Sequence, residues 1–92
     1  MKFIVEYSFG PSAYIAGTKR FAETQGPPPA GITLHGRWHA AGGHKGFTLA
    51  ETTDAKAIYA WVVGWADLLS FQVTPVLDDA EVAEVLAEHF KG

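Results

Sequence analysis

Residues 32–52, which read ITLHGRWHAAGGHKGFTLAET, decide the fold of this chain. Apolar and polar side chains alternate along 32–40 and again along 45–52, which is the pattern of two β-strands. The glycine pair at 42–43 between them is typical of a tight hairpin turn. In the first strand, strict alternation places Ile32, Leu34, Gly36, Trp38 and Ala40 on one face, and Thr33, His35, Arg37 and His39 on the other.

The segments that flank this hairpin have equally regular patterns. Alternation predicts one strand before the hairpin and one near the end of the chain, and helical spacing of apolar residues predicts a helix on each side. A third helix is predicted from Asp78, because Glu81 three residues later completes the spacing of a capping box. The predicted elements are strands over 2–9, 32–40, 45–52 and 71–77, and helices over 11–24, 54–69 and from 78 onward.

This order, β-α-β-β-α-β followed by a C-terminal helix, is the split βαβ or ferredoxin-like pattern. It predicts an α+β fold with a four-stranded antiparallel sheet, in a single domain over residues 1–92. Helices cover one face of such a sheet, and we expect the apolar strand faces, with Phe47 and Trp38, to lie beneath them. The other face is then polar and is formed by Glu6, Ser8, His35, Arg37, His39, Thr48, Gln72 and Thr74.

The composition limits the classes of function. Seven basic and ten acidic side chains give a formal charge of −3, which argues against a protein that binds nucleic-acid phosphates. The absence of cysteine excludes disulfides, thiolate metal sites and cysteine nucleophiles. No apolar run approaches the ~18 residues that span a bilayer, and charges at Lys2 and Glu6 do not fit a signal peptide. We expect a cytoplasmic protein without nucleic-acid or membrane partners.

The balance of charged and aromatic residues predicts a homodimer. Charged residues make up only 18% of the chain, against a usual ~25%. A small domain has much surface for its volume and needs charge to stay solvated. The three Trp, three Tyr and six Phe residues add large apolar areas that favour burial. We therefore predict that a second copy of the chain covers part of the surface.

Four distinctive segments extend over most of the chain: Gly36-Arg37-Trp38-His39, Gly46-Phe47, Trp61 with Trp65, and 71–77 (FQVTPVL). Together they resemble a family of small bacterial proteins of unknown function that is placed in the dimeric α/β-barrel superfamily. The resemblance implies that two four-stranded sheets pack face to face in a homodimer. Relatives in that superfamily include cofactor-less monooxygenases, haem-degrading enzymes, lactone isomerases and sensory domains, so the fold alone does not fix the function.

The polar strand face carries the candidate site. Enclosed by a second sheet, it would be a half-dry space in which histidine pKa values shift and arginine binds a carboxylate or enolate oxygen. We predict a homodimer that binds a small anionic or aromatic compound, with cofactor-independent acid–base or monooxygenase-type chemistry. The alternative is a non-catalytic dimerisation or sensory module. The candidate catalytic residues are His35, Arg37 and His39, and the candidate ligand-binding residues are Glu6, Thr48 and Gln72.

The sequence gives little support for a metal or a cofactor. His35 and His39 are four residues apart, about 13 Å along a strand, whereas two zinc ligands each lie ~2.1 Å from the ion. A site shared across a dimer axis, by either histidine with Glu6, is the alternative. The second helix has no histidine to serve as the haem ligand that haem-binding relatives commonly supply, and His89 fits a packing role. We predict no metal and no cofactor.

Overall fold

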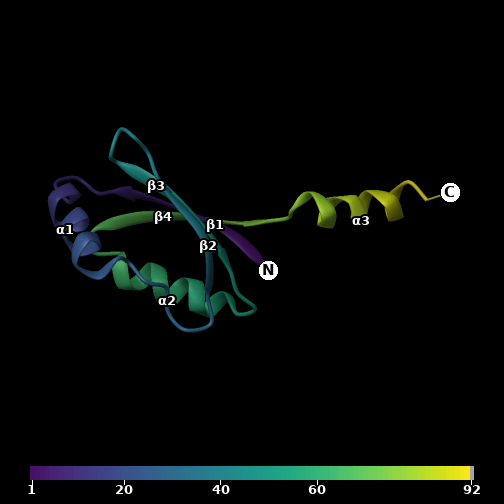
Figure 1. The fold of residues 1–92 in the computed structure, drawn as a ribbon, viewed down its shortest axis with the longest axis horizontal. Coiled ribbons are helices and arrows are strands. Elements are labelled where there is room, and N and C mark those ends of the chain that lie inside the picture. Colours follow the sequence, from purple (N-terminus) through teal and green to yellow (C-terminus); the bar gives the residue numbers. More distant parts are fainter. Residues whose placement is uncertain (92) are drawn as a thin grey trace.

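The structure is a computed structural model that describes residues 1–91. Its order of elements confirms the predicted α+β fold (Figure 1). Each of the three helices has 11 residues, and within the described residues none is long and apolar enough to cross a membrane. The elements are β1 (Lys2–Phe9), α1 (Tyr14–Thr24), β2 (Thr33–His39), β3 (Lys45–Glu51), α2 (Ala55–Trp65), β4 (Leu69–Val76) and α3 (Asp79–His89).

The four strands form one sheet in the order β2-β3-β1-β4, and every neighbouring pair is antiparallel. Helices α1 and α2 lie on the same side of this sheet, which we call the covered face (Figure 1). The side without these helices is called the open face. The strand register assigns to the open face Ile4 and Glu6 of β1, Trp38 of β2, Phe47 and Leu49 of β3, and Gln72 and Thr74 of β4.

A β-bulge in β2 reverses part of the predicted face assignment. Leu34 pairs with Ala50, but Gly36 already pairs with Leu49, so His35 is an extra residue in this strand. An extra residue shifts the alternation by one, and each side chain after it lies on the face opposite to the simple count. The prediction that Trp38 packs beneath a helix is therefore wrong: Trp38 lies on the open face and is 58% exposed.

The same bulge places Arg37 and His39 on the covered face, where Arg37 pairs with Thr48 and His39 with Gly46. Thr48 also pairs with Val5 of β1 and is buried. The sequence-based assignment of these polar residues to the uncovered face is wrong, and so is that of Phe47 to the face beneath the helices. Alternation in β3 does not show which face is covered, because the strand carries apolar residues on both faces. The pairing of Thr48 with buried Val5 assigns Thr48 to the covered face.

The core lies between the covered face and α2. Its buried cluster consists of Phe3, Val5, Ala50 and Ile58, with Trp61 and other half-buried apolar side chains packed around it. The side chain of Asp54 caps α2 and accepts a hydrogen bond from the Lys56 backbone N–H at 2.9 Å. The helix ends at Trp65, a turn earlier than predicted, because β4 already begins at Leu69.

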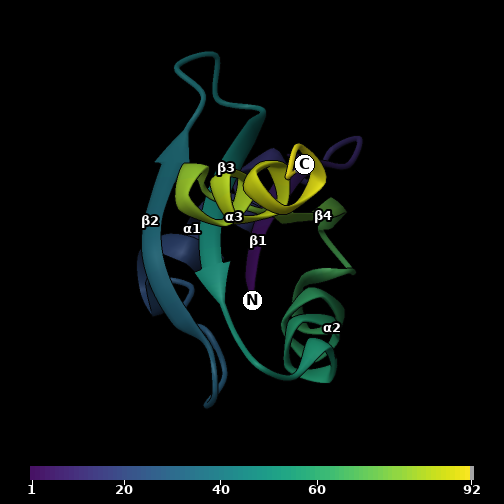
Figure 2. The ribbon, with the colours of Figure 1, turned by 90° about the vertical axis from the view of Figure 1, so that its right-hand side faces the viewer.

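Helix α3 extends away from the rest of the molecule beyond the end of β4 (Figure 1), and Figure 2 shows it end-on, in front of the sheet. It begins with the predicted capping box. The Glu81 backbone N–H donates to Asp78 Oδ1 at 2.9 Å, and the Asp78 backbone N–H donates to Glu81 Oε1 at 3.0 Å. No residue of α3 is buried. We call residues 77–91 the C-terminal arm.

Candidate functional site

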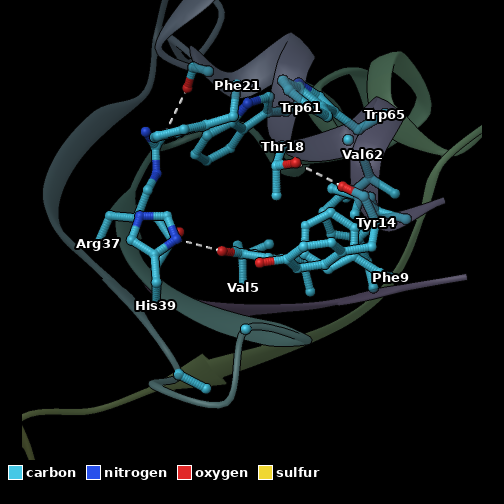
Figure 3. Close-up of a pocket in the computed structure, with 18 residues that line it drawn as sticks. Val5, Phe9, Tyr14, Thr18, Phe21, Arg37, His39, Trp61, Val62 and Trp65 are labelled. Carbon is cyan, nitrogen blue, oxygen red and sulfur yellow. Dashed lines mark hydrogen bonds between the residues drawn. The ribbon is translucent and has the colours of Figure 1, made fainter.

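A cavity of about 330 Å³ lies between the covered face and helices α1 and α2, inside a single chain (Figure 3). We call it the aromatic pocket, because seven of its lining side chains are Phe, Tyr or Trp. Arg37, His39, Thr18 and Thr48 supply most of its polar groups. The aromatic lining residues are Tyr7, Phe9, Tyr14, Phe21, Trp61, Trp65 and Phe71.

One row of the sheet brings Tyr7 to His39 across an intervening strand. Tyr7 pairs with Gly46, and Gly46 pairs with His39. A Cβ atom on Gly46 would lie 2.4 Å from the Tyr7 ring, so the ring occupies the space that any other side chain would fill. The hydroxyl of Tyr7 thereby reaches Nδ1 of His39 at 2.5 Å. Glycine at this position is what permits the Tyr7–His39 pair.

Both side chains of the pair line the pocket, and its surroundings shift the pKa of the Tyr7 phenol. Burial raises the pKa of the Tyr7 phenol, and the positive charge of Arg37 opposes this by lowering it. Because burial is the larger influence, the phenol keeps its proton near neutral pH and can donate it to Nδ1 of His39. In the imidazole tautomer that accepts this proton at Nδ1, the ring N–H is on Nε2.

Arg37 is the charged group of the pocket. Its Nη1 donates to the Gln25 carbonyl oxygen at 2.9 Å and its Nη2 to that of Gly26 at 2.5 Å. Its guanidinium carbon lies 5.2 Å from the ring centre of Phe21 and 5.9 Å from that of Trp61. Burial lowers the pKa of the Arg37 guanidinium, but arginine remains a cation in proteins.

This cation has no acidic partner among residues 1–91. The ion pairs within that range join Lys2 to Asp78, Arg20 to Asp67 and His35 to Glu51, and none of them involves Arg37. Two of the five N–H groups of a guanidinium are used by the two carbonyl oxygens, which leaves donors for another acceptor. A half-buried cation in an aromatic pocket therefore lacks a compensating anion.

The structure separates the six candidate residues into two groups. Arg37, His39 and Thr48 line the aromatic pocket. His35 lies outside it and forms a 2.6 Å hydrogen bond with Glu51, which lowers the pKa of that carboxyl. Glu6 and Gln72 pair with each other on the open face. The expected constellation of all six on one surface is therefore wrong.

Sequence reasoning missed Tyr7, because alternation placed it among the apolar core residues. The available signal was Gly46 within a strand, since a strand glycine often marks the close approach of another group. Phe21, Trp61 and Trp65 also line the pocket, although nothing in their helical spacing distinguishes a pocket residue from a core residue. Within residues 1–91, no group of three or more His, Cys, Asp or Glu side chains is arranged to hold a metal ion.

Alkaline titration tests the state of Tyr7. We expect one tyrosine to form its phenolate above the ordinary pKa of 10.0, because burial disfavours the charged form. The folded state then holds a proton that the unfolded chain releases near pH 10, so this stabilising contribution is complete below pH 10 and disappears as the pH rises through the raised pKa. Phenolate absorbance against pH is the measurement.

The Tyr7→Phe variant should lose that late step, whereas Tyr59→Phe, at an exposed position on α2, should retain it. Gly46→Ala should alter the step as well, because its methyl group displaces the Tyr7 ring. A late step that persists in Tyr7→Phe would show that another tyrosine is responsible.

Comparison with known proteins gives one match. A family model described as a domain of unknown function (DUF3303) matches residues 1–90, which is nearly the whole chain. The searches of curated proteins and of solved structures gave no match.

Proposed function

Since the chain belongs to the family of domains of unknown function DUF3303, we propose that it is a homodimeric protein that binds a small aromatic anion in the aromatic pocket of each protomer. We also propose that the family lies in the dimeric α/β-barrel superfamily, in which open faces of two sheets meet. The observation that carries the binding proposal is Arg37, a half-buried cation among aromatic rings with no carboxylate partner within residues 1–91.

The size and lining of the pocket define the ligand. Its volume of about 330 Å³ is at the lower end of the range for small-molecule sites and suits a compound with one or two rings. The lining aromatic residues offer edge and face contacts to a planar ring. The free N–H groups of Arg37 match a carboxylate or enolate, whose charge-assisted hydrogen bonds are stronger than neutral ones.

The Tyr7–His39 pair supplies acid–base chemistry at this site. His39 Nε2 donates its proton to a bound compound while Nδ1 accepts the proton of Tyr7. Burial disfavours the resulting phenolate and raises the pKa of Tyr7, and the positive charge of Arg37 offsets part of this effect. No cofactor enters this transfer. A monooxygenase-type reaction remains a prediction without a supporting contact, whereas proton transfer has the 2.5 Å pair.

Titration of the protein with benzoate and with benzyl alcohol tests the binding proposal. The two probes share the ring and differ in charge. We expect benzoate to bind at least about tenfold more tightly, because charged hydrogen bonds contribute more than neutral ones. Amide chemical shifts should change at Gly46, Thr48 and His39. Equal affinities, or shifts confined to Glu6 and Gln72 on the open face, would contradict the proposal.

The alternative of a non-catalytic dimerisation or sensory module differs in its working surface. In that case the open face, with exposed Trp38, does the binding, and the aromatic pocket has no ligand. A protein that dimerises but shows no pocket shifts with any aromatic anion would favour this alternative.

A further inference from the structure

The C-terminal arm carries an apolar stripe that nothing in the protomer covers. Val82, Val85, Leu86 and Phe90 recur at helical spacing and therefore share one side of α3. Their exposed fractions are 39%, 60%, 48% and 76%, and Leu77 at the root of the arm is 59% exposed. Apolar residues on one side of a helix are typical of a helix that packs that side against another part of a protein.

The dimensions of the protomer show that it is extended and exposes more surface than a compact domain. The radius of gyration is 15.7 Å, whereas a compact domain of this length has about 12 Å. The accessible surface is 6291 Å², against about 5,200 Å² for a typical folded monomer of this mass. The excess of about 1,100 Å² is comparable to the ≈ 800 Å² that each partner buries in a standard interface.

Charge is divided unevenly between the arm and the body. Residues 77–91 contain one basic and five acidic side chains, a formal charge of −4. Residues 1–76 contain six basic and five acidic side chains, a formal charge of +1. The body of a second copy is therefore a favourable partner for the arm, and another arm is an unfavourable one.

The open face carries exposed apolar side chains on β2 and β3, which could pack against the apolar stripe of an arm. Trp38 is 58% exposed and its ring lies over Gly36. Phe47 is directly opposite Trp38 on β3, and Leu49 is opposite Gly36. The exposed cation Lys45 lies 5.7 Å from the Phe47 ring centre, at the edge of this apolar area, where it can meet carboxylates of an arm.

From these observations we propose that the arms are exchanged: the apolar stripe of each arm packs on the β2–β3 half of the open face of a second copy. The proposal rests on the homodimer proposed above and assigns a specific contact within it. Asp78, held by its capping box and by a 2.9 Å ion pair with Lys2, directs α3 away from its own sheet.

The strand register limits the symmetry of this exchange. The arm leaves β4 after Val76, which pairs with Lys2, whereas Lys45 pairs with Ser8 at the opposite end of the sheet (Figure 1). A two-fold axis parallel to the strands would keep the arm away from the partner's Lys45 end. A two-fold axis perpendicular to the strands, close to the end of β4, reverses the strand direction of the partner, so that the arm of one copy runs along the open face of the other toward its Lys45 end.

Sedimentation of the full chain tests the exchange with a matched pair of variants. Leu86→Glu places a charge within the stripe, and Ala87→Glu places the same charge on the next residue, outside it. Both positions are exposed in the protomer, so neither change removes core packing. We expect Leu86→Glu to weaken the dimer by about a hundredfold, because the contact occurs twice, and Ala87→Glu to weaken it by less than about threefold.

Disulfide trapping locates the contact, and the natural absence of cysteine makes the engineered thiols unique. On oxidation, the double variant Lys45→Cys/Val85→Cys should give covalent dimers. Lys45→Cys/Ala87→Cys should give few. A covalently closed monomer would show that the arm folds back on its own sheet and would overturn the proposal.

The other outcomes are also decisive. Equal dimer affinities of Leu86→Glu and Ala87→Glu would overturn the exchange and leave the homodimer in place. A natural chain that stays monomeric at micromolar concentration would overturn the exchange together with the homodimer. Benzoate binding is measured within one protomer and is independent of both results.

Discussion

Replacing Arg37 by methionine should weaken the binding of benzoate by about a hundredfold, because two charge-assisted hydrogen bonds are lost while the pocket keeps a side chain of similar length. The side chain also holds the backbone carbonyl groups of Gln25 and Gly26. Isothermal titration of the natural chain and the variant gives the two dissociation constants. Benzyl alcohol, which carries no charge, should bind both proteins with similar affinity.

Arg20→Met is the matched control for this change. Arg20 forms its ion pair with Asp67 outside the aromatic pocket, so its loss removes one positive charge without removing a pocket donor. Arg37→Lys keeps the charge but lacks the planar fork, and its affinity should lie between those of the natural chain and Arg37→Met. Similar losses in Arg20→Met and Arg37→Met would mean that net charge, and not the pocket, governs binding.

Ile58→Ala should reduce the free energy of unfolding by about 3 kcal/mol, within the usual range for deleting a buried isoleucine. Ile58 is 4% exposed, and the other buried apolar side chains of the core cluster are Phe3, Val5 and Ala50. With so few members, the core has little capacity to close the resulting cavity. Urea unfolding at one fixed protein concentration gives the difference, and a fixed concentration also removes the effect of self-association on the midpoint.

Tyr59→Ala is the control, because Tyr59 is the next residue of α2 and is 72% exposed. Its change in the free energy of unfolding should be below about 0.5 kcal/mol. If the two variants lost equal stability, helix propensity and not core packing would be the main contribution of this segment.

The order of elements was predictable because its signals are local. Alternation along 2–9, the glycine pair at 42–43 and the Asp78 capping box each depend on a few neighbouring residues, and the structure has all three features. The end of α2 was less predictable. Apolar residues continue from the helix into β4, so composition alone does not mark the boundary.

The candidate site was predictable only in part, because strand faces are a tertiary property. Arg37, His39 and Thr48 do converge, but on the covered face and not on the face expected from alternation. A bulge at one residue leaves no clear mark in the sequence and reverses all later positions of its strand. Tyr7 joins the site through the sheet register across Gly46, and such pairing between distant segments cannot be read from spacing along the chain.

The bulge at His35 has a consequence for the way this strand tolerates insertions and deletions. His35 is the residue in excess, and the pairs on either side of it, Leu34 with Ala50 and Gly36 with Leu49, are already consecutive along β3. Deletion of His35 would therefore give a regular strand in which every other residue of β2 keeps its pairing partner on β3. Homologues one residue shorter here would place the same arginine and histidine in the aromatic pocket and would lack the bond to Glu51.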